Sequence, residues 1–129
     1  MKIATWNVNS VNVRLPNVLK YLKDYQPDVL CLQELKCIED KYPAESFEGE
    51  GYSSIQACQK TYNGVSIISN IKPKDIEFNP VNVSPDEVRS ISATYDKFRV
   101  INFYVVNGQS IGSEKYEHKL KWLDKARIY

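Results

Sequence analysis

The chain has 129 residues, 43% of them hydrophobic and 26% charged, which is enough for one globular domain with a core of its own. Its net charge of +1 is far from the basic excess of many nucleic-acid-binding domains, so a DNA-binding surface would have to be local. No segment approaches the ~20 consecutive apolar residues of a membrane span, which excludes a transmembrane helix.

The first 34 residues predict a strand, a helix and a second strand. Apolar residues at positions 15, 18, 19 and 22 form one helical stripe, with Pro16 expected in the first turn of the helix. The helix should end at Gln26, because the residue before a proline is disfavoured in the α region. Such a unit makes the two strands parallel neighbours, with their carboxyl ends at the same edge of the sheet.

Polar side chains stand at the end of both predicted strands. The first apolar run, from Ile3, ends at Asn7. The second, Val29 to Leu32, is continuously apolar, as in a strand buried on both faces, and Gln33 and Glu34 follow it. An amide and a carboxylate are therefore expected together at one rim, where oxygen atoms could hold a hard cation.

The remainder of the chain is predicted to be rich in strands, with one helix at its end. Asn63-Gly64 is a hairpin signal, Lys72 to Pro85 reads as an edge strand and a surface loop, and a tight turn is expected at Asp96-Lys97. Ser113 is the expected N-cap of the last helix. The predicted segments are a short helix in 43–50, strands over 52–57, 65–69, 75–78, 90–95 and 99–106, and an apolar helix face formed by Tyr116, Leu120, Leu123 and Ile128, with Trp122 beside it.

Several strings in this order resemble the exonuclease III family of abasic-site (AP) endonucleases, within the endonuclease/exonuclease/phosphatase superfamily. The resemblance runs from the first residue to the last. The strings are Ala4-Thr5-Trp6-Asn7-Val8-Asn9-Ser10, Gln26-Pro27-Asp28-Val29, Leu32-Gln33-Glu34-x-Lys36, Gly51-Tyr52, Gln59-Lys60-Thr61-Tyr62-Asn63-Gly64-Val65, Arg89-Ser90-Ile91, Asn102-x-Tyr104 and Asn107-Gly108-Gln109-Ser110.

The resemblance implies a four-layer α/β sandwich, of which residues 1–129 are the N-terminal part of a single domain. Two further strings of the family, Gly-Asp-x-Asn and Ser-Asp-His, do not occur in these residues. The last helix also has no glycine or proline stop, which indicates a truncated chain. The three cysteines lack metal-site spacing, and the start of the chain reads as a strand rather than a signal peptide, so a cytoplasmic location is expected.

For the active site, the resemblance implies that Glu34 is a ligand of Mg²⁺, with Mn²⁺ as a possible substitute. It places Asn7 beside the metal, as a ligand or as a group that orients acidic neighbours, and it makes Tyr104 a catalytic residue. Tyr104 could donate a hydrogen bond to the scissile phosphate or act as a phenolate, and the sequence leaves both open. Asn9 is a weaker candidate. His118 is expected on the polar side of the last helix, without a catalytic role.

The expected partner is double-stranded DNA with abasic sites or 3′ ends, and the full-length enzyme is expected to be a monomer. Lysine and arginine side chains neutralise phosphates, and amides position them. The residues expected on the DNA side are Lys36, Lys60, Tyr62, Asn63, Arg89, Asn107 and Gln109.

The sequence therefore predicts a magnesium-dependent DNA repair nuclease of the exodeoxyribonuclease III type, both AP endonuclease and 3′-5′ exonuclease, with this chain as an inactive fragment. Two alternatives stay open. One is a non-catalytic truncated product, and the other is a different phosphodiesterase or phosphatase of the same superfamily. Two departures from the family pattern bear on the site: Val106, where proline is common, and Leu35, where threonine is usual.

Overall fold

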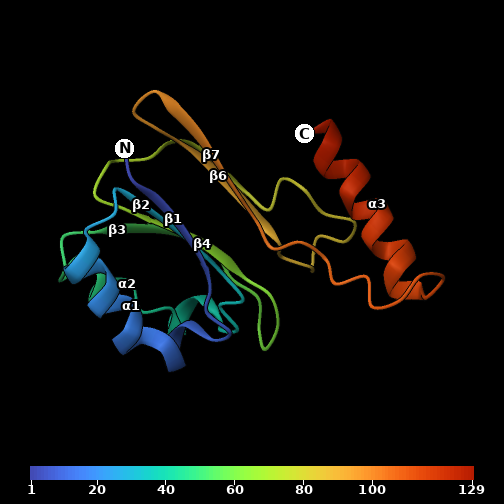
Figure 1. The fold of residues 1–129 in the computed structure, drawn as a ribbon, viewed down its shortest axis with the longest axis horizontal. Helices are drawn as coiled ribbons and strands as arrows, with labels where there is room; N and C mark the ends of the chain where they lie inside the picture. The colour runs from blue at the N-terminus through green and yellow to red at the C-terminus, as the bar shows by residue number, and fades with distance from the viewer.

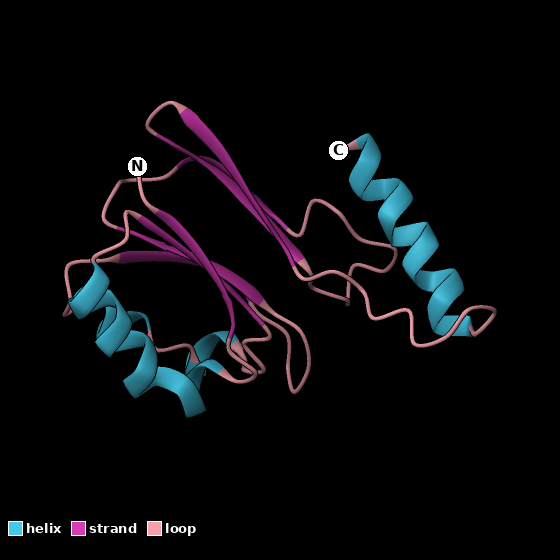
Figure 2. Cartoon of the chain, viewed as in Figure 1, coloured by secondary structure: helices cyan, strands magenta, loops and turns pink.

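The computed structural model describes residues 1–129 and arranges them in four layers (Figures 1 and 2). Helices α1 and α2 cover one face of a four-stranded sheet, a three-stranded sheet lies on its other side, and α3 lies beyond the second sheet. This layered α/β architecture confirms the predicted fold class. The elements are β1 (Ile3–Asn7), α1 (Val11–Tyr25), β2 (Val29–Gln33), a 3-10 turn (Glu39–Lys41), α2 (Ala44–Glu48), β3 (Ser53–Ala57), β4 (Val65–Ser69), β5 (Lys74–Phe78), β6 (Ser90–Tyr95), β7 (Phe98–Phe103) and α3 (Glu114–Ile128).

Strands β1 and β2 pair in parallel, with Asn7 opposite Gln33 at their carboxyl ends. This confirms the predicted strand–helix–strand unit and brings the two polar strand ends to one edge. The first sheet continues with β4 and β3, both paired in antiparallel fashion, in the order β1-β2-β4-β3. The carboxyl end of β2 therefore lies next to the start of β4.

Helix α1 begins earlier than the apolar stripe suggested. Ser10 is its N-cap, and the Ser10 hydroxyl accepts a hydrogen bond from the backbone N–H of Val13 at 3.4 Å. The expectation that Pro16 lies in the first turn is therefore wrong, because Pro16 stands inside the helix. The carbonyl left without a donor belongs to Asn12, whose exposure allows water to replace the missing bond. The helix ends at Gln26, as predicted.

The space between the two sheets is filled by apolar side chains. Every residue of β2 and β4 is buried, which confirms β2 as a strand covered on both faces. One cluster joins the sheets to each other, and a second joins the first sheet to α1 and α2. The buried residues of the cluster between the sheets are Val29, Cys31, Ala57, Val65, Ile67, Ile91, Ala93, Tyr95 and Val100.

The second sheet has the order β5-β6-β7. Strand β5 is exposed at every position, in agreement with the predicted edge strand, and Asp96-Lys97 turns β6 into β7 as predicted. Strand β7 ends at Phe103 rather than Val106, so Tyr104 follows the strand instead of lying within it. The backbone N–H of Tyr104 still donates to the carbonyl of Arg89 at 2.8 Å, which fixes Tyr104 at the end of the sheet.

The hairpin predicted from Asn63-Gly64 is present, since β3 and β4 are consecutive antiparallel neighbours, and its connection is longer than the pair itself. Strands β3 and β4 are antiparallel, but the whole segment 58–64 connects them. The carbonyls of Asn63 and Gly64 accept hydrogen bonds from the backbone N–H groups of Lys36 and Leu35, at 3.0 and 3.2 Å. The pair therefore attaches the hairpin loop to the segment after β2, next to Glu34.

Helix α3 uses a different face from the one predicted. Ser113 is its N-cap, as expected, and the Ser113 hydroxyl accepts from the N–H of Tyr116. The residue that packs inward is Trp122, which is 1% exposed, whereas Leu120 and Leu123 are 44% and 39% exposed. The indole lies edge-on to Phe103, with the ring centroids 5.2 Å apart. The large indole buries more apolar area than either leucine, which accounts for the rotation of the helix.

Each sheet has two edge strands, β1 and β3 in the first and β5 and β7 in the second, and the β1 and β7 edges lie on the same side of the molecule. Strand β7 packs over β2 and β4, while β6 packs over β4 and β3. The order from β7 to β5 in the second sheet therefore follows the order from β1 to β3 in the first. None of the helices combines the length and apolar character that a membrane crossing requires.

Candidate active site

The carboxylate of Glu34 is at the centre of a polar cluster where β1 and β2 end. The amide nitrogen of Asn7 donates to Glu34 Oε1 at 2.9 Å. Glu34 has φ 58°, in the left-handed region that is costly for a residue with a side chain. This backbone turn directs the Glu34 side chain toward Asn7 on the neighbouring strand.

Asn7 is held from both ends of its amide. Its side-chain oxygen accepts a hydrogen bond from the backbone N–H of Asn9 at 3.1 Å, which fixes the amide nitrogen toward Glu34. In this arrangement Asn7 orients the carboxylate. The Asn7 amide oxygen, which a metal ion would contact, accepts one hydrogen bond and keeps a second lone pair, and a direct ligand role for Asn7 stays a prediction.

Tyr104 reaches the same rim from the second sheet. Its hydroxyl lies near enough to the Glu34 carboxylate for each group to shift the pKa of the other. The predicted neighbourhood of Asn7, Glu34 and Tyr104 is therefore confirmed as geometry. Burial raises the pKa of the Tyr104 hydroxyl, the Glu34 carboxylate raises it further, and Arg89 opposes both, with a net rise above the ordinary 10.0. A raised pKa keeps the phenol protonated near neutral pH, which favours Tyr104 as a hydrogen-bond donor over a phenolate.

The charge on Glu34 is stabilised despite partial burial. Burial raises the pKa of this carboxyl group, but the hydrogen bond from Asn7, the neighbouring Tyr104 hydroxyl and the charge of Lys36 together outweigh it. The pKa of Glu34 therefore lies below its ordinary 4.5, and the group is ionised at neutral pH. Lys36 Nζ lies 3.4 Å from Glu34 Oε2 and 2.5 Å from the side-chain oxygen of Asn9.

A buried amide network lies directly behind these groups. Gln33 donates to the side-chain oxygens of Thr5 and Asn102, both at 2.8 Å. Asn102, on β7, donates in turn to the backbone carbonyls of Leu32 and Ser66, both at 2.9 Å. The network joins the strand that precedes Glu34 to the strand that precedes Tyr104, so it fixes the separation of the two functional groups.

A divalent cation has only a partial set of ligands in this chain. No group of three or more histidine, cysteine, aspartate or glutamate side chains is arranged to hold a metal ion. Glu34 fits the part of a single carboxylate ligand to Mg²⁺, which usually keeps several waters. Lys36 competes for the same carboxylate, so a bound cation would have to displace or share this contact.

Residues 4–127 match the Endonuclease/Exonuclease/phosphatase family. The chain belongs to this family. It is similar to a 3′-5′ exonuclease (NExo) from Neisseria meningitidis, with 45% sequence identity and a TM-score of 0.95 over 100% of this chain and 51% of that one. A second structure, of the 3′ phosphatase NExo from Neisseria bound to a product DNA hairpin, gives the same four values.

Two further relatives agree. An AP endonuclease from Archaeoglobus fulgidus is 43% identical, with a TM-score of 0.94 over 100% of this chain and 50% of that one. The exodeoxyribonuclease III of Haemophilus influenzae is 30% identical over 131 residues, which cover 100% of this chain and 48% of that protein. The chain thus spans about half the length of these relatives. Their names confirm the resemblance to exonuclease III and AP endonucleases.

Some residues help to hold the site in place although the sequence did not predict that role for them. Asn102 and Gln33 stood in two of the strings, but only the fold shows that they bond to each other. His118 was expected on a polar surface, yet its Nε2 lies 2.8 and 3.0 Å from the carboxylate oxygens of Glu87. No local pattern signals that contact, because the two residues are 31 positions apart.

Of the residues predicted on the DNA side, Lys36 and Arg89 are part of the cluster around Glu34 and Tyr104. Lys60 and Tyr62 are exposed in the 58–64 loop, which is bound to the segment after β2. In the same loop, Asn63 donates to Gln59 at 3.0 Å. Two more of the predicted residues, Asn107 and Gln109, are exposed in the loop between β7 and α3 and are linked to each other, Gln109 N–H donating to the side-chain oxygen of Asn107 at 2.9 Å.

Both departures from the family pattern are filled by buried apolar side chains. Leu35 is fully buried, and a Cβ added to Gly64 would stand 3.0 Å from that of Leu35, so the two backbones approach closely. Val106 packs with Val81 and Trp122 under helix α3. The two substitutions therefore contribute to packing around the site.

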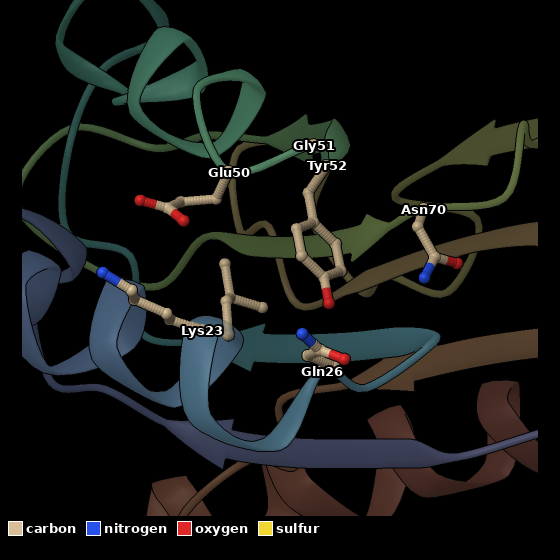
Figure 3. A pocket seen from close by; sticks show the side chains of 7 residues that line it. Lys23, Gln26, Glu50, Gly51, Tyr52 and Asn70 are labelled. Carbon is tan, nitrogen blue, oxygen red and sulfur yellow. The ribbon is translucent and has the colours of Figure 1, made fainter.

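A separate hollow of about 280 Å³ lies between the end of α1 and the start of β3 (Figure 3). Gln26 precedes β2 and Asn70 follows β4, so this hollow is at the opposite end of the first sheet from Glu34. The Tyr52 hydroxyl points across it and donates to the carbonyl of Pro27 at 2.9 Å. That bond gives Tyr52 a structural role.

Proposed function

We propose that the protein containing this chain is a magnesium-dependent DNA repair nuclease, which cuts the backbone beside abasic sites and trims 3′ ends. The observation that carries the proposal is the carboxylate of Glu34, which accepts a hydrogen bond from Asn7 at 2.9 Å and lies beside Tyr104 at the rim of two packed sheets. The names of the related exonucleases and AP endonucleases support the same reaction class.

Each member of the cluster has a distinct task in this proposal. Glu34 would hold Mg²⁺, or Mn²⁺ in its place, which would supply charge stabilisation for a phosphoryl oxygen and the leaving oxygen. Asn7 keeps the Glu34 carboxylate in one orientation. Tyr104 donates a hydrogen bond to the scissile phosphate, in keeping with its protonated phenol. The water nucleophile would be activated by a group outside these 129 residues.

The substrate in this proposal is double-stranded DNA with an abasic site or a 3′ end. The 58–64 loop is bonded to the segment just after Glu34, and the loop after Val106 begins just after Tyr104; together they expose cationic and amide side chains suited to phosphates. The proposed DNA contacts are Lys36, Lys60, Tyr62, Asn63, Asn107 and Gln109. Arg89, which was also expected on the DNA side, packs on the Tyr104 ring at the rim.

We further propose that residues 1–129 are the N-terminal part of one domain that functions as a monomer when complete. Coverage of about half of each related structure supports this. The unpaired edges of β1 and β7 on one side of the molecule also support it, because strands added there would extend both sheets together.

The decisive experiment uses the protein read from the whole open reading frame that contains these residues. Three end-labelled substrates should be compared in Mg²⁺ and in chelator: a duplex with one abasic site, a duplex with a recessed 3′ end, and a phosphomonoester of an inositol lipid. Cleavage of the two DNA substrates, abolished by chelator, is the expected result.

Turnover of the lipid phosphate alone would instead favour another phosphatase of the same family. If all three substrates remain intact although the protein is folded, the non-catalytic alternative holds.

A further inference from the structure

We infer that Glu87 and His118 are positioning residues for the catalytic rim: they hold the Arg89 guanidinium on the ring of Tyr104 and so connect helix α3 to the reaction. The inference rests on the proposed nuclease function for its kinetic consequences. Its structural basis is a continuous set of contacts from α3 to the phenol that faces Glu34.

Arg89 is packed against Tyr104 in two ways. Its guanidinium carbon lies 4.7 Å from the centre of the Tyr104 ring, within the range of a cation–π contact, and its Nη1 donates to the Tyr104 carbonyl at 3.3 Å. The Arg89 side chain is only 12% exposed. A guanidinium in this position restricts the tilt of the phenol and leaves little surface for a phosphate, so positioning Tyr104 describes Arg89 better than a DNA contact does.

Glu87 fixes the other side of the guanidinium. Its Oε1 accepts a hydrogen bond from Arg89 Nε at 2.8 Å. The backbone of Glu87 is held as well, since its N–H donates to the carbonyl of Ser84 at 3.1 Å and its carbonyl accepts from the side chain of Asn79 at 3.1 Å. A charge-assisted bond from a fixed backbone gives Arg89 one orientation.

His118 connects the same carboxylate to α3. Its Nε2 lies 2.8 Å from Glu87 Oε1 and 3.0 Å from Oε2, across 31 positions of the chain. The His118 ring is half-buried, and Trp122, one turn further along α3, anchors this face of the helix against Phe103. Glu87 therefore adds a polar link between the segment before β6 and helix α3, which also pack together through Val81 and Trp122.

The structure also offers a matched control on the same helix. Glu117 precedes His118 and lies in the same shallow groove with Val83 and Lys121, but it is exposed and makes no hydrogen bond to Glu87 or Arg89. Replacing Glu117 with alanine removes the same charge and the same side-chain atoms as Glu87→Ala, but leaves the contacts among Arg89, Glu87 and His118 in place.

The test measures kcat and KM on abasic duplex with the complete protein, for Glu87→Ala, His118→Ala and Glu117→Ala, after thermal unfolding has verified that each is folded. A small misplacement of a group that acts in the transition state lowers kcat strongly, so we expect kcat to fall about 10-fold for Glu87→Ala and about 3-fold for His118→Ala. KM should stay within about 2-fold in both variants, and Glu117→Ala should match the wild type.

Epistasis separates positioning from general structural damage. If Glu87 acts through Arg89, adding Glu87→Ala to Arg89→Ala should lower kcat no further, whereas independent effects would multiply. Glu87→Gln should recover part of the loss, because its amide oxygen can still accept from Arg89 Nε. Multiplying effects, or a rise in KM with unchanged kcat, would overturn the inference.

A spectroscopic measurement keeps the inference testable even if the protein cleaves no DNA. The ring resonances of Tyr104, assigned by their loss in Tyr104→Phe, should shift in Glu87→Ala and His118→Ala as the guanidinium leaves the ring, and stay in place in Glu117→Ala. Identical Tyr104 ring shifts in all three variants would contradict the coupling, independently of the proposed nuclease activity. If Glu87→Ala does not fold, the comparison rests on His118→Ala against Glu117→Ala.

Discussion

The side-chain amide of Gln33 donates to that of Asn102 at 2.8 Å, and this bond joins the two sheets directly behind Glu34 and Tyr104. Gln33 ends β2 and precedes Glu34, while Asn102 lies on β7 two positions before Tyr104. The geometry of the candidate active site is therefore set by a buried polar contact that itself performs no chemistry. This arrangement makes separate predictions for stability and for activity.

The first prediction concerns that contact. Asn102→Ala removes three buried hydrogen bonds and leaves the carbonyls of Leu32 and Ser66 without their donor. The free energy of unfolding should fall by roughly 2–4 kcal/mol. Urea denaturation of the complete protein measures it, with the exposed Asn107→Ala as control, expected within about 0.5 kcal/mol of wild type. Equal stability of the two variants would show that the network is dispensable.

The second prediction concerns the metal ligand. Glu34→Gln keeps the shape of the side chain but removes the charge that a hard cation requires. Incision of abasic duplex should fall by roughly 100-fold or more and recover in part at high Mg²⁺ or Mn²⁺, with the fold intact. The exposed Glu48→Gln on α2 is the matched control and should cleave normally. A mutant at position 34 with the magnesium dependence of the wild type would exclude Glu34 as a ligand.

The third prediction decides between the two roles of Tyr104. Its pKa is raised above 10.0 by burial and by the neighbouring Glu34, so the phenol stays protonated across the neutral range. If the protonated form donates to the phosphate, Tyr104→Phe should lower kcat by a factor, on the order of 100, that is constant between about pH 6.5 and 9. If the phenolate acted instead, the rate of the wild type would climb about tenfold per pH unit below that pKa. Rate profiles of the two proteins over this range provide the measurement.

The fourth prediction concerns residues 1–129 made alone. We expect no incision of abasic DNA, because groups that act as a unit lose most of their rate when one member is absent. We also expect self-association, because the edges of β1 and β7 are unpaired on one side and Leu120, Leu123 and Ile101 are exposed. Sedimentation velocity and binding of a hydrophobic dye report on the association. A monodisperse monomer that nicks abasic DNA only in Mg²⁺ would contradict both parts.

Local patterns in the sequence determined much of the fold. The continuous apolar run before Gln33 predicted a strand buried on both faces, and β2 is buried at every position. Ser113 predicted the start of α3, and Asp96-Lys97 the turn between β6 and β7. These features depend on side-chain period, capping and turn geometry, which involve only residues near one another in the chain.

The sequence also determined which side chains meet at the rim. A parallel pair of strands places both carboxyl ends at one edge, so the neighbourhood of Asn7 and Glu34 follows from topology alone. The start of α1 before Pro16 was not determined in this way, nor was the inward rotation of Trp122. The start of α1 is set by the Ser10 cap together with backbone bonds from Ser10 and Val11 to the segment after β2. The rotation of α3 depends on the core partner of Trp122, Phe103, which comes from a different element.

The tertiary structure alone decided the contacts that hold the rim in place. Asn102 bonds across the core to β2, and His118 reaches Glu87 from a separate element, over separations of 70 and 31 positions. A polar side chain in a sequence carries no signal of its distant partner, because hydrogen bonds are specific only once the backbones are placed. The sequence thus determined the groups capable of chemistry, and the packing of two sheets and a helix decided their orientation.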